Sequence, residues 1–240
     1  METDPRRLLE IASAAARARG TEILEIGFEK WTRSGYRGRR EGKKIAVLYI
    51  SDYLDGAPEE VLSDFIGAVA DYVMGRKPSL GDAYRKYMTS DGFILEKRPI
   101  YLKRSRNITR TDTGRYRNIY DSVQRLLDRG LLTADDLDNS YFTWTSKPNY
   151  TRLGHCQQIF RVVVISSVFD DPAVPESVFD FVVYHECLHL RQGYRPFNRH
   201  PHDAEFRRQE KLFPGYAETE AWLKKIPAMG RKCGRRLCFK

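Results

Sequence analysis

Pro-Glu-Ser-Val-Phe-Asp-Phe-Val-Val-Tyr-His-Glu-Cys-Leu-His-Leu-Arg-Gln-Gly, residues 175–193, is the stretch that decides how the second half of the chain folds. Proline favours the first turn of a helix and glycine favours its end, so we expect one helix between Pro175 and Gly193. Residues four apart on a helix lie one above the other, so His185 and His189 present two imidazoles to one point, with Glu186 about 100° round the axis. This HExxH spacing predicts a metal site with a carboxylate beside it.

Histidines cluster around this motif. Four of the five in the chain (His185, His189, His200 and His202) lie within 18 residues. A catalytic zinc site needs a third protein ligand and an open position for water. The metzincin pattern is excluded, because Gln192 and Arg195 stand where it requires glycine and the third histidine. The candidates for the third ligand are His202, which we favour, then His200, Glu205 and Glu210.

Several motifs together resemble the SprT-like and YgjP-like zinc metallopeptidases. They are His185-Glu-Cys-Leu-His189, His202-Asp-Ala-Glu-Phe206, Leu212-Phe-Pro-Gly-Tyr216 and Trp222-Leu223, with Trp144-Thr145, Arg152-Leu153-Gly154, Cys156 and the strand-like run 161–167 upstream. The resemblance covers about residues 118–223. It implies one Zn²⁺ ion held by His185, His189 and His202, with Glu186 as general base. The four-cysteine zinc ribbon common after SprT domains is absent, and Cys233 and Cys238 offer only half of one.

The expected fold is α+β, with a zincin-like catalytic domain in which a small sheet packs on the HExxH helix. We expect an N-terminal α+β region over 1–96, a basic linker over 97–117, the catalytic domain over 118–223 and a basic tail over 224–240. Helices are predicted over about 5–20, 58–75, 119–130 and 175–193. Strands are predicted over 23–28, 44–51, 141–145 and 160–168. The region 23–73 is also similar to the N-terminal part of YgjP-like proteins.

The expected chemistry is peptide-bond hydrolysis of a peptide or protein substrate. Zinc makes hydroxide available at neutral pH, and Glu186 would take the water proton and return it to the departing amine. Tyr216 is the candidate transition-state stabiliser, since zincins often use a downstream tyrosine, and Tyr194 is the alternative. We expect the run 161–167 to form a sheet edge where an extended peptide adds as a strand.

Positive charge is concentrated in three segments. Segments 33–44, 97–117 and 224–240 carry net charges of +5, +7 and +7 in a chain of net charge +9, so the remainder is net acidic. Such clustering favours a polyanionic partner, although basic linkers and a solubilising tail would give the same pattern. The predicted sequence-independent nucleic-acid contacts are Lys103, Arg104, Arg106 and Arg110, with Tyr101 and Tyr116 placed to stack on unpaired bases. The alternative function is therefore a nucleic-acid-binding protein whose zinc is mainly structural.

Other features exclude broad classes of protein. The longest apolar runs, 162–168 and 178–183, are far shorter than the roughly 18 residues that span a bilayer. The charged N-terminus lacks the apolar core of a secretory signal, so we expect a cytoplasmic protein without a membrane partner. Four cysteines are too few for a disulfide scaffold. The sequence leaves the oligomeric state unknown.

Overall fold

The computed structural model describes residues 2–197 and 200–230. The fold is mixed α+β and divides into two compact units, Met1–Arg104 and Ser105–Lys240. This boundary differs from the expected one, because residues 97–104 complete a helix of the first unit and 105–117 belong to the second. Cys233, Cys238 and most of the basic tail lie outside the described residues.

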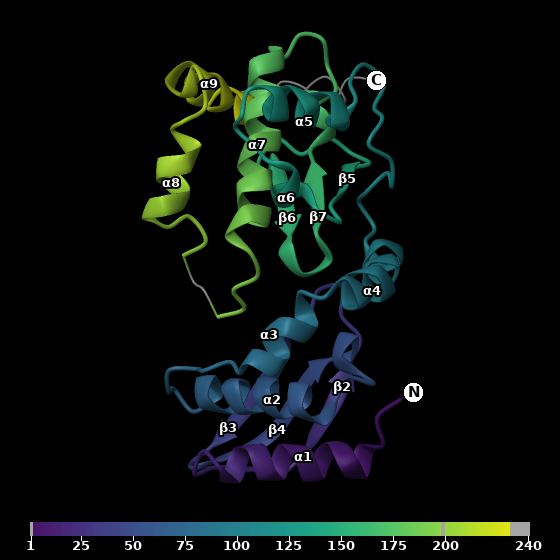
Figure 1. Cartoon of the computed structure of the whole chain (residues 1–240), viewed down its shortest axis with the longest axis vertical. Helices are drawn as coiled ribbons and strands as arrows, with labels where there is room; N and C mark the ends of the chain where they lie inside the picture. The colour runs from purple at the N-terminus through teal and green to yellow at the C-terminus, as the bar shows by residue number, and fades with distance from the viewer. Residues whose placement is uncertain (1, 198–199, 231–240) are drawn as a thin grey trace, which may run out of the picture. The chain divides into compact units, whose positions relative to one another are not determined.

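The first unit combines a small sheet with four helices (Figure 1). Its elements are α1 (Pro5–Arg17), β1 (Glu22–Ile23), β2 (Ile26–Glu29), β3 (Tyr36–Glu41), β4 (Lys44–Ser51), α2 (Glu59–Val73), α3 (Asp82–Met88) and α4 (Asp91–Arg104). As expected, Asp4 caps α1 by accepting a hydrogen bond from the Arg6 backbone N–H, and Pro5 follows it. Strand β4 pairs in parallel with β1 and β2 and antiparallel with β3, so the predicted strand 23–28 is interrupted.

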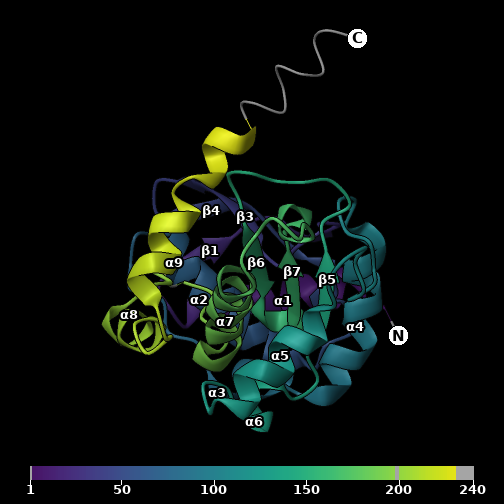
Figure 2. The same ribbon diagram turned by 90° about the horizontal axis from the view of Figure 1, so that it is seen from above.

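The second unit contains the histidine motif. Its elements are α5 (Ile119–Asp128), α6 (Ala134–Leu137), β5 (Tyr141–Trp144), β6 (Gly154–Gln157), β7 (Val162–Ile165), α7 (Glu176–Gln192), α8 (Ala204–Glu210) and α9 (Tyr216–Leu223). The sheet order is β5-β7-β6, with β7 parallel to β5 and antiparallel to β6. Helix α7 lies between this sheet and helices α8 and α9 (Figures 1 and 2).

The prediction that 161–167 forms the sheet edge is wrong. All four residues of β7 are fully buried, and β7 is the central strand with a neighbour on each side. An unbroken run of β-branched residues is what burial on both faces requires. The edge strand that contacts α7 is β6. Among the described strands, β6 pairs only with β7.

Buried contacts fix α7 along its length. The ring of Phe179 stacks on Trp144 of β5 with centroids 5.4 Å apart. One turn before His185, the fully buried Asp180 accepts a 2.7 Å hydrogen bond from the Ser122 hydroxyl and two from the Arg125 guanidinium of α5, at 2.6 and 2.9 Å. Since a buried carboxylate is tolerated only when it is paired, this cluster sets the position of the motif helix. Among the described helices, none is long and apolar enough to cross a membrane.

Candidate metal centre

Three imidazoles meet at one point on the surface of α7. His185 and His189 come from successive turns of that helix, and His202 comes from the loop before α8. One nitrogen of each histidine can be chosen so that all three lie within 4.8 Å of one another. The Nε2 atoms of His189 and His202 are 3.1 Å apart. Nitrogen ligands of a tetrahedral zinc ion with bonds of about 2.05 Å would be about 3.3 Å apart, so the donor set fits a divalent ion of this kind.

The predicted third histidine is therefore the one that the structure brings to the pair. His202 follows His189 by thirteen residues. Asp203 beside it caps α8 by accepting a hydrogen bond from the Phe206 backbone N–H. This cap starts the helix directly after His202 and fixes where that histidine lies. His200 is exposed and is not part of the group.

The ring of Phe206 supports all three histidines. Its centroid lies 5.1 Å from that of His185, 4.5 Å from His189 and 4.7 Å from His202, and the side chain is buried. An apolar ring in this place excludes water from one side of the imidazoles and restricts their orientation. Sequence reasoning gave Phe206 no role at the site beyond its place in the family motif.

Glu210 is hydrogen-bonded to one of the three histidines and is not itself a member of the candidate ligand group. Its Oε1 atom is 2.7 Å from Nδ1 of His185. That hydrogen bond leaves Nε2 of His185 as the nitrogen available to an ion. Burial alone would lower the pKa of His185, but the hydrogen bond to Glu210 and the nearby carboxylate charges outweigh it and raise the pKa. Burial alone would raise the pKa of Glu210. The hydrogen bond to His185 and the charge of that residue outweigh burial and lower the pKa of Glu210.

Glu205, the other carboxylate candidate, is committed elsewhere. It is exposed and accepts hydrogen bonds from Arg208 at 2.7 and 2.8 Å and from Gln209 at 2.8 Å. These hydrogen bonds, that from Arg208 most of all, lower the pKa of Glu205 to about 2. The carboxylate belongs to the outer face of α8.

The two remaining imidazoles are held in their neutral form. Burial, followed by the charges of His185 and His202, lowers the pKa of His189 to about 4. Burial and the charge of His185 also lower the pKa of His202. A neutral imidazole has a free lone pair, which is the form that binds a metal ion.

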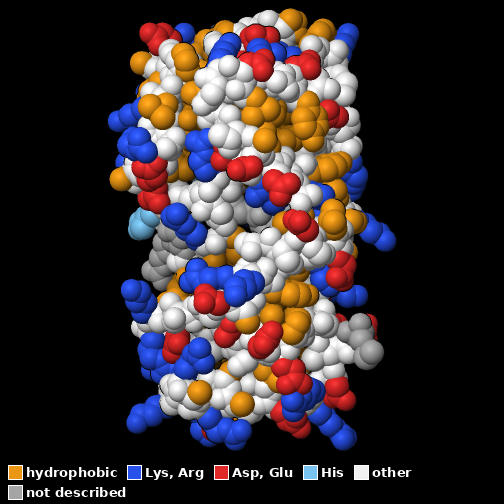
Figure 3. Space-filling model, in the orientation of Figure 1, with side chains coloured by type: hydrophobic (Ala, Val, Ile, Leu, Met, Phe, Trp, Pro, Cys, Tyr) orange, Lys and Arg blue, Asp and Glu red, His pale blue; other side chains and the backbone are white. Residues whose placement is uncertain are grey.

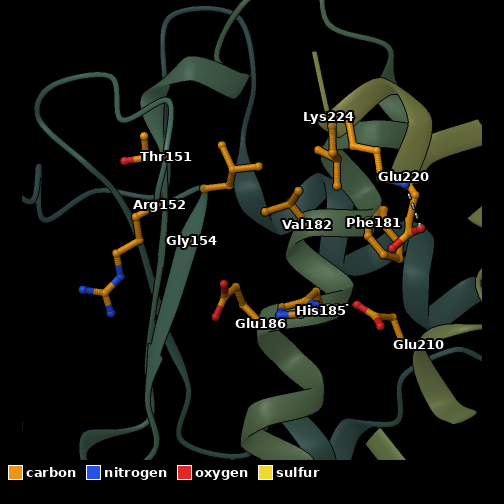
Figure 4. A pocket seen from close by; sticks show the side chains of 12 residues that line it. Thr151, Arg152, Gly154, Phe181, Val182, His185, Glu186, Glu210, Glu220 and Lys224 are labelled. Carbon is orange, nitrogen blue, oxygen red and sulfur yellow. Dashed lines mark hydrogen bonds and ion pairs between the residues drawn. The ribbon is translucent and has the colours of Figure 1, made fainter. Parts of the chain in front are cut away.

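Glu186 is packed against the backbone of β6. It is only 5% exposed, and a Cβ atom placed on Gly154 would lie 2.6 Å from its Oε1 atom and 2.8 Å from its Cγ atom. Figure 4 shows its carboxylate between β6 and α7, next to His185. Burial raises the pKa of Glu186 to about 7, against the lowering influence of His185 and Arg152. A carboxyl group with this pKa can both take and release a proton near neutral pH.

Two cavities open on either side of Glu186. One, of about 300 Å³, lies at the histidines and is lined by residues of β6 and its flanks, including His155, Cys156 and Gln158. The other, of about 470 Å³, extends toward α9. Both are lined by Arg152, Gly154, His185 and Glu186, so together they form a cleft along β6 past the carboxylate. Figure 4 shows the side chains that line the larger cavity.

The predicted tyrosine donors do not line this cleft. The Tyr216 hydroxyl donates to Glu220 at 2.9 Å, and its ring packs edge-on against Phe181 with centroids 5.7 Å apart. Burial, with the hydrogen bond to Glu220, raises the pKa of Tyr216 to about 12. Tyr194 lies in the loop after α7 and lines neither cavity. The role of Tyr216 stays a prediction, and Arg152 is an exposed donor that lines both cavities.

The four predicted nucleic-acid contacts are divided between the two units. Lys103 and Arg104 end α4 in the first unit, and Arg106 and Arg110 follow in the second. Arg104 donates to both oxygens of Asp52, at 2.8 and 2.5 Å, and to the Trp31 carbonyl at 2.8 Å. Lys103, Arg106 and Arg110 are exposed, whereas Tyr101 is buried and so cannot stack on a base.

No protein-family model matches the chain, and no curated protein matches it in sequence. The resemblance to SprT-like and YgjP-like peptidases therefore depends on the motif residues quoted above.

Proposed function

We propose that the chain is a zinc-dependent peptidase. The observation that supports it is the placement of a buried carboxylate, Glu186, on the same helix as two of three converging imidazoles and against the edge strand β6. A purely structural zinc site needs four protein ligands and has no use for a proton acceptor beside it. Here the described histidines supply three ligands, and the carboxylate faces a cleft.

The residues divide the work between binding and proton transfer. His185, His189 and His202 would hold the ion, with Glu210 orienting His185. Zinc bound there supplies a Lewis acid and an activated water at neutral pH. Glu186 would take a proton from the attacking water and return it to the departing amine, which its position beside the histidines in the cleft permits.

Strand β6 offers the substrate a template. It pairs with β7 only, so its backbone groups can pair with an extended peptide. Gly154 at its start lies against Glu186, and a peptide added along β6 would therefore pass the carboxylate. Main-chain pairing of this kind requires an unfolded or flexible segment as substrate.

The test is Glu186→Gln in the zinc-loaded full-length protein. The change keeps the ligands and removes the base, so cleavage of unfolded casein should fall by about 100- to 10,000-fold while zinc affinity stays the same. The matched control is Glu205→Gln, an exposed carboxylate on α8. Glu186→Gln activity within about tenfold of wild type would reject the role of this residue.

A further inference from the structure

The 470 Å³ cavity beside Glu186 has a mainly apolar wall. We call it the α9 cavity, because Glu220, Leu223 and Lys224 at the end of that helix close one side. Phe181 and Val182 of α7 form a second side, and Leu153 before β6 forms a third. Its volume falls within the range of about 300–1,000 Å³ typical of ligand sites, so it has room for the largest amino-acid side chain.

Two carboxylates that line the α9 cavity, Glu210 and Glu220, already have partners. Glu210 is hydrogen-bonded to Nδ1 of His185 at 2.7 Å. Glu220 accepts a 2.9 Å hydrogen bond from the Tyr216 hydroxyl and forms an ion pair with Lys224 at 3.7 Å. A charged side chain placed beside Glu210 or Glu220 would lose water without gaining a free partner, whereas an apolar side chain would lose only its contact with water.

The cavity also lies where a side chain of a cleaved peptide would point. It shares Arg152, Gly154, His185 and Glu186 with the cavity at the histidines. A peptide paired with β6 directs alternate side chains to opposite faces, and those on the α7 face enter the cleft. The residues next to the cleaved bond are the nearest to Glu186.

We infer that the α9 cavity selects a large apolar or aromatic side chain at one of the two positions flanking the cleaved bond. This inference rests on the proposed peptidase function and names its substrate class: unfolded segments rich in leucine, methionine or aromatic residues. Leu223 sets the depth of the cavity from α9, and Val182 sets its wall on α7.

The experiment is a specificity profile. Zinc-loaded full-length protein digests unfolded casein, and mass spectrometry identifies the cleaved bonds. Peptides made around the preferred bond then differ only at the two flanking positions. Leu, Met, Phe or Tyr at one of them should give kcat/KM values about tenfold or more above those for Ala, Asp or Lys, the range set by hydrophobic pockets.

Two variants of Leu223 change the cavity in opposite directions. Leu223→Phe fills it and should lower cleavage of the Phe and Tyr peptides by about tenfold relative to the Ala peptide. Leu223→Ala enlarges it and should shift the preference toward Phe and Tyr over Leu. The matched control is Leu212→Phe, which makes the same substitution at an exposed position outside the cavity and should leave the profile unchanged.

A binding measurement separates selection from catalysis. Zinc-loaded Glu186→Gln protein, with a fluorescent label on the preferred peptide, should bind the Leu or Phe peptide about tenfold more tightly than the Ala peptide, and Leu223→Phe should abolish the difference. Cleavage without preference at either position, or a preference for Asp or Glu at the mouth beside Arg152, would overturn the inference alone. No cleavage of casein by wild type would overturn the peptidase function and this inference with it.

Discussion

The hydrogen bond between Glu210 and His185 sets the tautomer and orientation of one imidazole within the protein itself. Partners of this kind typically contribute about 10- to 100-fold to metal affinity without touching the metal. Glu210→Gln should therefore lower zinc affinity by about that factor in a competitive titration. Glu205→Gln, a change on the exposed face of α8, should leave it unchanged. A complete loss of zinc binding in Glu210→Gln would instead make Glu210 a ligand.

The two loop histidines should behave differently. His202 belongs to the group of nitrogens within 4.8 Å, and His200 does not. Because losing a ligand costs more than losing its supporting partner, His202→Ala should reduce zinc affinity by more than about 100-fold, and His200→Ala should not reduce it. The same competitive titration measures both. The reverse result would make His200, and not His202, the third ligand.

The absence of a side chain at Gly154 leaves room for the Glu186 carboxylate. A methyl group there would overlap Glu186, so Gly154→Ala should displace the carboxylate and lower peptide cleavage, by up to about 100-fold for a shift of 1 Å. Zinc affinity, which the histidines determine, should stay at the wild-type value. Gly92→Ala, where an added Cβ meets nothing within 4 Å, is the control. Full activity in Gly154→Ala would show that Glu186 has freedom to move.

At the residue scale, the helical spacing predicted His185, Glu186 and His189 as a group, because one helix fixes their relation. His202 required a further argument from clustering, since a loop separates it from the helix. The contacts of Phe206, Gly154 and Glu210 with these residues arise only when α8 and β6 pack on α7, and no spacing along the chain encodes them.

At the scale of elements, an ion pair holds the end of α7 in place. Arg191 donates to both oxygens of Asp136 at 2.8 and 2.7 Å, to the Leu131 carbonyl at 2.8 Å and to Gln209 of α8 at 3.1 Å. The motif helix is thus connected to α6 and α8 directly after His189. Burial would raise the pKa of Asp136, but the hydrogen bonds from Arg191 and Thr133 outweigh it and lower the pKa.

This lowered pKa predicts a pH dependence of stability. A carboxyl group with a lower pKa in the folded protein stabilises it above its unfolded pKa of about 3.9, and that contribution is lost as the pH falls through the folded value. In zinc-free protein, Asp136→Asn should lower the free energy of unfolding by about 1–3 kcal/mol at pH 7 and by less at pH 3. Urea unfolding at both pH values measures this. The exposed Asp135→Asn is the control, and an equal loss at both pH values would contradict the assignment.

The order of strands shows what element-level patterns leave open. The composition of 160–168 predicted a buried strand, and the structure forms a shorter one over 162–165 at the centre of the sheet. The edge strand beside α7 is β6, a short strand whose four residues are all half-buried. Taken alone, its sequence resembles that of a loop. Burial can be inferred from residue types, but which strand neighbours which depends on how the chain returns to the sheet.

At the scale of the whole molecule, some residues of the basic segment 97–117 have structural roles, and net charge alone does not distinguish these from residues available to a partner. Within the second unit, Arg117 donates to the Val174 carbonyl and lies over the Phe179 ring, with its Cζ atom 5.2 Å from the centroid. On the face drawn in Figure 3, Lys and Arg side chains are interspersed with Asp and Glu in each unit. The expected linker contains the second half of α4, a helix along which Phe93, Ile94, Lys97 and Tyr101 are buried. Pro99 inside that helix and the dense positive charge hid its apolar spacing from sequence analysis.

Nucleic-acid binding remains a prediction for the exposed residues of this segment, and the structure changes how it is tested. Arg104 has to be left out of any charge reversal, because its bonds to Asp52 stabilise the first unit. Lys103, Arg106 and Arg110 remain. If all three contact phosphates, log affinity for labelled DNA should fall against log salt with a slope of about −2 to −3, and their reversal to Glu should flatten it.

Fluorescence anisotropy with single- and double-stranded DNA between low and physiological salt measures this slope. The control reverses three exposed basic residues of the first unit, Arg6, Arg17 and Lys86, and so changes net charge by the same amount. Because phosphate attraction falls off within about 10 Å at moderate salt, reversal at the contact points should weaken binding far more than reversal elsewhere. Equal weakening by both triple reversals would mean that net charge alone attracts DNA. Absence of binding at low salt would leave the segment as a helix end and a surface loop, and the α9 cavity as the determinant of substrate choice.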